Sequence, residues 1–191
     1  MLYIVATPIG NLKDISFRAV EVLKSVDLIA CEDTRHSKIL LDHFGIQTPT
    51  TSFYQHNRIV KADYLIKLLQ EGKDIALVSD AGTPGILDPG YNLINLAIKN
   101  NIQITVIPGP TAFVNALVLS GKQANKFVFE GFLPNKSGAR KNRLIELSKL
   151  DYTIVFYESC HRILKTLEDL KEVFGDREVV CVRELTKKFE E

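Results

Sequence analysis

One stretch decides the fold: the apolar run Ile75-Ala76-Leu77-Val78 leads directly into the loop Ser79-Asp80-Ala81-Gly82-Thr83-Pro84-Gly85. A second stretch repeats this pattern, with Ile104-Thr105-Val106-Ile107 followed by Pro108-Gly109-Pro110-Thr111. Short apolar runs that are bounded by Gly and Pro are typical of buried strands in a parallel sheet. Ligands of such sheets bind beyond the carboxyl ends of the strands. The two loops therefore predict a small-molecule site.

The composition is that of a folded domain without bulk charge. The chain has 191 residues, of which 46% are hydrophobic, and its formal net charge is +1. So small a charge argues against nucleic-acid binding through bulk charge alone, although it leaves room for a local basic patch. Three cysteines without CxxC spacing indicate reduced thiols, and the strand-like start shows no signal peptide, so we expect a cytoplasmic protein. No apolar run approaches the ~20 residues that span a bilayer, so we expect no membrane contact.

Strands and helices alternate through the first half of the chain. Such alternation predicts βαβ crossovers and a mainly parallel sheet. We expect strands at residues 2–6, 28–31, 74–78 and 102–107. Helices are expected at residues 16–25, from a Thr34 cap to Gly45, and at 57–71, 90–100 and 111–119.

The character of the chain changes near residue 122. Beyond it we expect strands at residues 127–132, 153–157 and 179–182, with helices at residues 139–148 and 163–174. The predicted fold class is thus α/β with two α/β domains. Residues 1–121 form the N-terminal domain, which holds the mainly parallel sheet, and residues 122–191 form a C-terminal domain that is incomplete at its end.

Eight short motifs follow one another in an order that is more specific than any one of them. The ordered set resembles the ribosomal RNA small subunit methyltransferase I family of bacteria, within the tetrapyrrole-methylase superfamily, and covers essentially the whole chain. The motifs are residues 5–15 (VATPIGNLKDI), 31–36 (CEDTRH), 78–84 (VSDAGTP), 88–90 (DPG), 108–110 (PGP), 130–134 (EGFLP), 156–162 (FYESCHR) and 183–186 (RELT).

This resemblance implies S-adenosylmethionine bound in a cleft between the two domains. It also implies methyl transfer to the ribose 2′-hydroxyl of a cytidine in the 16S rRNA of the small ribosomal subunit, and a homodimer. Family members usually continue for several tens of residues beyond this chain's end. The cofactor-binding residues that it implies are Pro8, Asp80, Ala81, Gly82, Thr83, Pro84, Pro108, Gly109, Thr111, Ala112, Phe132, Leu133, Glu158, Arg183, Glu184 and Leu185.

Each loop also has a structural interpretation. The loop at residues 80–84 is alternatively an ordinary tight turn between strand and helix, and Thr111 alternatively only caps its helix. The loop is not a phosphate loop, because no Gly-Lys-Ser/Thr follows. A dinucleotide-binding fold has little support, because no GxGxxG follows the first strand.

Residues 32–36 carry the densest polar chemistry. A ribose hydroxyl has a high pKa, so a carboxylate that accepts its proton would assist its attack on a methyl group. Glu32, Asp33, Arg35 and His36 are therefore the acceptor-side catalytic candidates, and Arg35 suits a phosphate. The alternative is that residues 33 and 34 cap the next helix while the charges are solvated.

A basic stretch and the histidines are two further features of the sequence. The basic stretch at residues 136–143 is either a contact for rRNA phosphates or a solvated loop. The four histidines, His36, His43, His56 and His161, show no metal-ligand spacing, so we expect no metal. Two other functions stay open: a methyltransferase of a tetrapyrrole such as a corrin precursor, and a cofactor-binding or dimerisation module without catalytic activity.

Overall fold

The computed structural model describes residues 1–55 and 58–191 and divides them into two compact units. Unit 1 comprises Met1–Thr111 and Thr186–Lys188, and unit 2 comprises Ala112–Leu185 and Phe189–Glu191. The division after Thr111 falls before a helix that our domain boundary at residues 121/122 assigns to the first domain. The domain boundary at residues 121/122 therefore stays a prediction.

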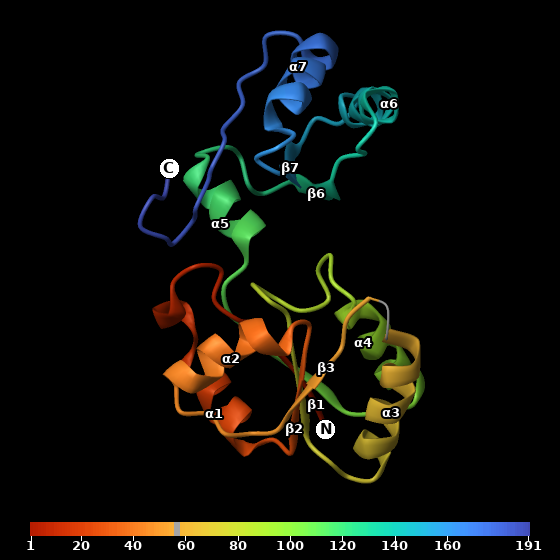
Figure 1. The fold of residues 1–191 in the computed structure, drawn as a ribbon. Coiled ribbons are helices and arrows are strands. Elements are labelled where there is room, and N and C mark those ends of the chain that lie inside the picture. Colours follow the sequence, from red (N-terminus) through yellow and green to blue (C-terminus); the bar gives the residue numbers. More distant parts are fainter. Residues whose placement is uncertain (56–57) are drawn as a thin grey trace. The chain divides into compact units, whose positions relative to one another are not determined.

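Unit 1 is built on a parallel sheet of five strands (Figure 1). The strand order is β3-β2-β4-β1-β5, and every pairing is parallel. The order brings the ends of β4 and β5, which carry the two Gly/Pro loops, to either side of β1. The strands are β1 (Leu2–Val5), β2 (Leu28–Cys31), β3 (Thr50–Ser52), β4 (Ile75–Val78) and β5 (Ile104–Ile107).

Helices cover both faces of this sheet, as an amphipathic helix between parallel strands requires. Side chains of α3 and α4 pack with Leu2, Ile4 and Leu77 on one face. Side chains of α1 and α2 pack with Val5, Ile29 and their neighbours on the other. The helices are α1 (Phe17–Ser25), α2 (Thr34–His43), α3 (Arg58–Gln70) and α4 (Gly90–Lys99), with a 3₁₀ turn, η1, at Leu12–Asp14.

The predicted α/β class and its parallel sheet are confirmed, whereas several elements differ locally from their expected bounds. β3 was not predicted, because its three polar residues form no apolar run. Asp33 rather than Thr34 caps α2, because its side chain accepts the Arg35 N–H; Gly45 does follow the helix end with φ +61°. The third expected helix, at residues 57–71, is observed as α3 from Arg58 to Gln70; Asn57 and His56 lie outside the described residues.

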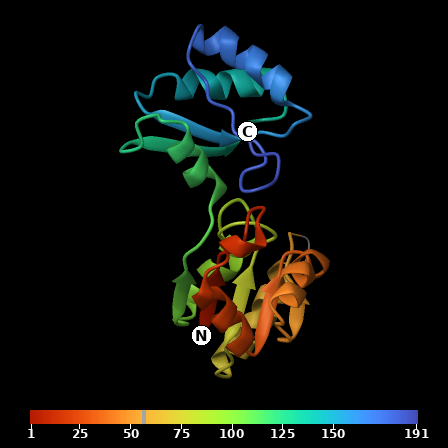
Figure 2. The same cartoon turned by 90° about the vertical axis from the view of Figure 1, so that its left-hand side faces the viewer.

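Unit 2 holds a parallel pair of strands with helices on both faces (Figure 2). α6 and α7 pack on one face around buried Leu133, Leu144 and Leu170. On the other face, the Phe113 ring of α5 stacks on Phe129 at a centroid distance of 4.2 Å. The elements are α5 (Ala112–Leu119), β6 (Phe127–Phe132), α6 (Ser137–Leu147), β7 (Thr153–Tyr157) and α7 (Ile163–Phe174).

The strand predicted at residues 179–182 is wrong. The backbone there forms no strand, and the Val179 and Val180 side chains are 49% and 43% exposed. An apolar run becomes a strand only where a neighbouring strand satisfies its N–H and C=O groups, and in the described part of unit 2 the only ladder joins β6 and β7.

Among residues 1–55 and 58–191, no helix is long and apolar enough to cross a membrane.

Candidate functional site

The loops that follow β1 and β4 are joined to each other at the carboxyl edge of the unit 1 sheet. Thr7 and Gly82 exchange two backbone hydrogen bonds, with N···O distances of 2.9 and 3.0 Å. The Thr7 hydroxyl donates to the Ser79 carbonyl at 3.1 Å. Gly82 has φ +84°, which a side chain rarely tolerates. Pro8 and the loop at residues 80–84 therefore follow two neighbouring strands and lie at the same edge of the sheet.

The loop after β5 meets the same loop from its other side. The Thr83 and Thr111 hydroxyl oxygens lie 2.8 Å apart, and the Thr83 hydroxyl also lies 3.4 Å from the Pro110 carbonyl. Gly109 lies so close to β1 that a Cβ on it would be 2.9 Å from the Ala6 Cβ. A glycine is therefore required there by the close approach of two backbones.

The loop after β2 adds carboxylates to this edge. The Asp33 N–H donates to Asp80 Oδ1 at 3.0 Å, and the Asp80 N–H lies 3.4 Å from Glu32 Oε2. Burial raises the pKa of Glu32, and the nearby Asp80 and Asp88 charges act in the same direction. Glu32 is thus a half-buried carboxylate with a greater affinity for a proton than an exposed one.

Asp33 and Arg35 are engaged with each other. Arg35 donates from Nε and Nη2 to the two Asp33 carboxylate oxygens at 3.2 and 2.8 Å, and its N–H adds a third bond. These contacts lower the pKa of Asp33 to about 2. So weak a base accepts a proton poorly, which leaves Glu32 as the better candidate. His36 lies exposed on the first turn of α2.

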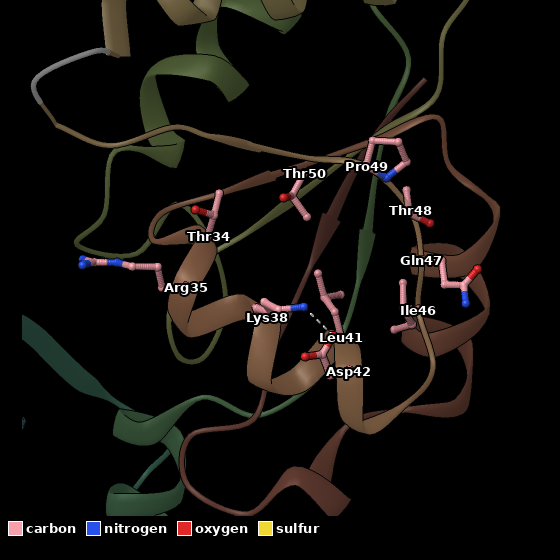
Figure 3. A pocket seen from close by; sticks show the side chains of 10 residues that line it. All are labelled: Thr34, Arg35, Lys38, Leu41, Asp42, Ile46, Gln47, Thr48, Pro49 and Thr50. Atoms are coloured by element: carbon pink, nitrogen blue, oxygen red, sulfur yellow. Dashed lines mark hydrogen bonds and ion pairs between the residues drawn. The ribbon is translucent and has the colours of Figure 1, made fainter.

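A groove of about 500 Å³ lies between α2 and the segment that leads into β3 (Figure 3). Buried Leu41 and Ile46 contribute apolar side chains to its lining, and threonine hydroxyls surround them. Its Lys38 pairs with Asp42 at 3.0 Å. Of the residues predicted for the site, only Arg35 lines this groove, so it is separate from the loops after β4 and β5.

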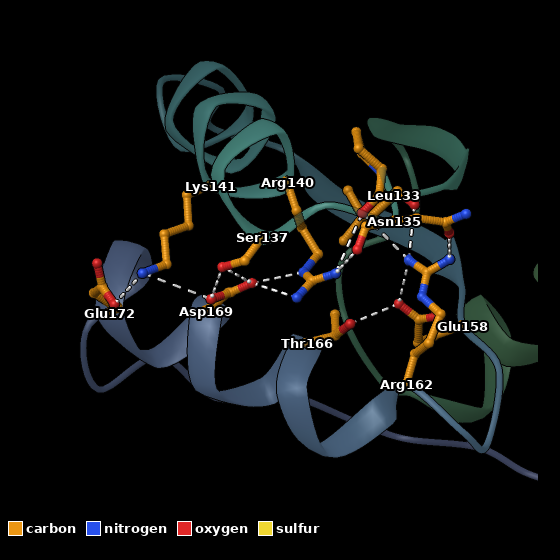
Figure 4. A network of polar contacts seen from close by, with 11 residues as sticks. Leu133, Asn135, Ser137, Arg140, Lys141, Glu158, Arg162, Thr166, Asp169 and Glu172 are labelled. Carbon is orange, nitrogen blue, oxygen red and sulfur yellow. Dashed lines mark hydrogen bonds and ion pairs between the residues drawn. The ribbon is translucent and has the colours of Figure 1, made fainter.

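In unit 2, Glu158 is held by its own neighbours (Figure 4). Its side chain is 4% exposed and accepts from the Thr166 hydroxyl at 2.7 Å, from Arg162 at 3.2 Å and from the Ser159 N–H at 2.7 Å. Leu133 is buried in the core, whereas Phe132 is 55% exposed. Glu158 is thus placed to stabilise the turn after β7.

The remaining predicted residues lie in the last part of the chain. Arg183 exchanges backbone hydrogen bonds with Glu191 and forms a salt bridge with its side chain at 2.6 Å, and Glu184 has φ +53°. Glu184 is exposed and Leu185 is half-buried. Ala112 begins α5.

Most basic side chains of the stretch at residues 136–143 form ion pairs within unit 2. Arg140 is buried and pairs with Asp169 at 2.6 Å, Lys141 pairs with Glu172 at 2.6 Å, and Arg143 pairs with Glu130 at 2.6 Å. The stretch begins the helix α6, so the observed role is structural. Across residues 1–55 and 58–191, no group of three His, Cys, Asp or Glu side chains is arranged to hold a metal ion.

Asp88 lies in the motif at residues 88–90, but no role was predicted for it from the sequence. Its carboxylate oxygens accept from the Gly85 N–H at 3.0 and 2.9 Å, and Oδ1 accepts from the Gly90 N–H at 2.7 Å. Burial raises the pKa of Asp88, and these backbone donors act against that rise. The signal was an aspartate between two glycines, three residues after one and two before the other, since each of those N–H groups needs an acceptor.

The fold and the sequence together define a class. A profile of the Tetrapyrrole (Corrin/Porphyrin) Methylases matches residues 1–191. The chain belongs to this family. Its backbone is similar to that of the cobalamin biosynthetic enzyme cobalt precorrin-4 methyltransferase, with a TM-score of 0.74 and 17% identity over 100% of this chain and 82% of the other.

Within that family, the similar curated proteins are ribosomal RNA small subunit methyltransferases I. The chain is 53% identical to that of Vibrio cholerae over 100% of its own length and 66% of the relative's. It is 51% identical to that of Haemophilus influenzae over 100% of its own length and 68% of the relative's. The resemblance predicted from the eight motifs is confirmed, and the chain spans about two thirds of the length of these relatives.

Proposed function

We propose that the protein is an S-adenosylmethionine-dependent methyltransferase that acts on the 16S rRNA of the small ribosomal subunit. One observation carries this proposal, namely identity of 53% over the whole chain to a protein named ribosomal RNA small subunit methyltransferase I. We further propose that the methyl group goes to the 2′-hydroxyl of a cytidine ribose. A cytoplasmic location and a homodimer complete the proposal.

The residues at the carboxyl edge of the unit 1 sheet suit such a cofactor. Gly82 has no Cβ and has φ +84°, a conformation that side chains rarely adopt, so no side chain of its own covers the loop backbone there. Asp80 offers carboxylate oxygens to an ammonium group, and Thr83 and Thr111 offer hydroxyls to polar groups. S-adenosylmethionine supplies an electrophilic methyl group when it is bound.

Glu32 is the residue that we assign to the acceptor. Its carboxylate is half-buried, its pKa is raised, and it lies at the end of the strand next to β4. A base of raised pKa removes the hydroxyl proton more readily as the oxygen attacks. Alignment of oxygen and methyl supplies much of the remaining acceleration.

The test uses the chemistry of the product. Purified complete protein and labelled cofactor are incubated with small subunits from a strain that lacks the enzyme. The recovered 16S rRNA is then hydrolysed in alkali, which cleaves only next to a free 2′-hydroxyl. We expect the label in an alkali-resistant dinucleotide that contains cytidine. Label in a mononucleotide would refute the 2′-O assignment, and no label would refute the rRNA substrate.

A matched pair of variants tests the base. Glu32→Gln should lower kcat at least tenfold while S-adenosylhomocysteine binds with unchanged affinity, because only proton acceptance is lost. Asp33→Asn serves as the control: its weakly basic carboxylate caps α2, so it should alter stability more than kcat. Equal effects of the two changes on kcat would refute the assignment.

A tetrapyrrole substrate is the second candidate. The description of the family to which the chain belongs, Tetrapyrrole (Corrin/Porphyrin) Methylases, favours it. Cobalt precorrin-4 methyltransferase and the methyltransferase CobJ match with TM-scores of 0.74 and 0.68, but at 17% and 18% identity they support the fold alone. A tight optical shift on titration with a tetrapyrrole, together with no transfer to rRNA, would favour this candidate.

A further inference from the structure

The connection from β4 to α4 spans residues 79–89, which is longer than the two to six residues usual between a strand and a helix of an α/β unit. A long loop must be fastened if it is to hold one conformation, because each free residue costs about 1–2 kcal/mol to order. The first half of this loop is fastened by the Thr7–Gly82 bridge. In its second half, the Asp88 side chain accepts three backbone hydrogen bonds, and the Asn92 side chain donates to the Pro89 carbonyl at 3.3 Å.

Asp88 closes the loop on itself and onto the next helix. Both carboxylate oxygens accept from the Gly85 N–H, and Oδ1 also accepts from the Gly90 N–H that starts α4. The fit is close, since a Cβ on Gly90 would lie 2.6 Å from Asp88 Oδ1 and 3.1 Å from Leu77 Cδ2. The end of the loop is thereby held against the start of α4 and close to Leu77 of β4.

The bond to Gly85 also orients the residue before it. The peptide bonds described here are trans, so the Pro84 carbonyl points away from the Gly85 N–H and hence away from Asp88. Pro84 itself is buried and has its φ fixed by its ring. Asp88 therefore sets the direction of the last peptide of the loop at residues 80–84.

The loop is also strained at the position before Asp88. Leu87 has φ +64°, which costs a residue other than glycine roughly 1–2 kcal/mol, and its side chain is 56% exposed. Packing of an exposed side chain does not explain such a conformation. Backbone strain persists only where surrounding bonds enforce it, and Asp88 supplies those bonds.

We propose that Asp88 is a positioning residue for cofactor binding, which holds Gly82, Thr83 and Pro84 in their binding conformation without touching the ligand. This inference rests on the proposed function. Asp88 acts through the Pro84–Gly85 peptide and the start of α4, whereas the Thr7–Gly82 bridge holds the other end of the loop.

The chain offers a matched control at the opposite end of the same strand. Asp27 also accepts a backbone N–H that precedes β4, that of Asp74, at 2.8 Å. Asp88→Asn places an amide donor against the Gly85 N–H or leaves that N–H with fewer acceptors. Asp27→Asn makes the equivalent change far from the carboxyl edge.

The experiment compares both variants of the complete protein by S-adenosylhomocysteine titration, thermal unfolding and hydrogen exchange. Asp88→Asn should weaken binding on the order of tenfold and speed exchange at Gly85 and Gly90, because a small misplacement of binding groups is costly. Asp27→Asn should keep its affinity within about twofold even where it lowers the melting temperature equally.

A double variant separates positioning from stability. Leu87→Gly relieves the strain, so adding it to Asp88→Asn should restore stability while affinity stays weak. Recovery of affinity along with stability, or wild-type affinity in Asp88→Asn, would overturn the inference. Failure of the unaltered protein to bind would instead overturn the proposed function, and this inference with it.

Discussion

Unit 2 depends for part of its stability on a buried ion pair between α6 and α7. The Arg140 side chain is 4% exposed and that of Asp169 is 9% exposed. Burial raises the pKa of Asp169, but hydrogen bonds from Ser137 and Arg140 outweigh it, so the net pKa is lowered. The carboxylate is therefore charged at neutral pH. Arg140 is its closest positive partner at 2.6 Å, and Lys141 Nζ lies farther away at 3.7 Å.

Arg140→Met removes this compensation and more. The guanidinium donates to Asp169 at 2.7 and 2.6 Å and to the Pro134 and Asn135 carbonyls at 3.3 and 3.1 Å. Breaking one side of a buried pair costs about 3–5 kcal/mol, because a charge is left without its partner. We expect unit 2 to lose stability of this size.

Arg143→Met is the matched control on the same helix. Arg143 also pairs with carboxylates, but its side chain is 40% exposed, and exposed pairs contribute about 0–1 kcal/mol. Hydrogen exchange at the amides of α6 and α7, followed by mass spectrometry, reports the local opening free energy of unit 2 directly. Equal losses in the two variants would refute the reasoning. The double variant Arg140→Met/Asp169→Leu should regain most of the loss.

Three further predictions concern single residues. Gly109→Ala should lower the free energy of unfolding in urea by about 1–3 kcal/mol, because the new Cβ would meet Ala6. Gly138→Ala has open space around it and should raise that free energy by up to about 1 kcal/mol. A larger loss in Gly138→Ala than in Gly109→Ala would contradict this reasoning. Leu87→Asn should raise the melting temperature, since asparagine tolerates positive φ; a fall would show that the leucine packs in solution. The stabilisation from Asp33 is present above its usual pKa of 3.8 and is lost as the pH falls to about 2. Asp33→Asn should abolish that part of the acid dependence of stability. Acid unfolding that is the same in the variant would contradict this role of Asp33.

The apolar runs predicted the central strands, because a strand that is buried on both faces has a continuous run of apolar residues, and the sequence records that run. All four residues of β4 are buried, and β1 is nearly as enclosed. β3 left no such record, since an edge strand of three polar residues is defined by its pairing with β2. Residues 179–182 show the converse, because apolar character alone does not create a partner strand.

The site was predictable where a loop follows a strand. Parallel pairing gathers the strand ends, so the sequence order of β1, β4 and β5 indicated that Pro8, Gly82 and Gly109 meet at one edge. The partner of each charge was not predictable, because it depends on which helix faces lie together. Arg140 lies in the basic stretch, for which rRNA phosphates were one interpretation, yet its guanidinium donates to Asp169. Glu158 was a predicted cofactor-binding residue, yet its carboxylate accepts from the Thr166 hydroxyl.

The strand order has a consequence for how the protein is made. β1 lies between β4 and β5, whose residues follow it by 73 and 102 positions in register. At synthesis rates of 5–20 residues per second, β1 leaves the ribosome roughly 5–20 s before its second neighbour exists. An apolar segment that waits so long is a natural client for a chaperone, so slowing translation before residue 104 should increase the fraction of nascent chains that aggregate.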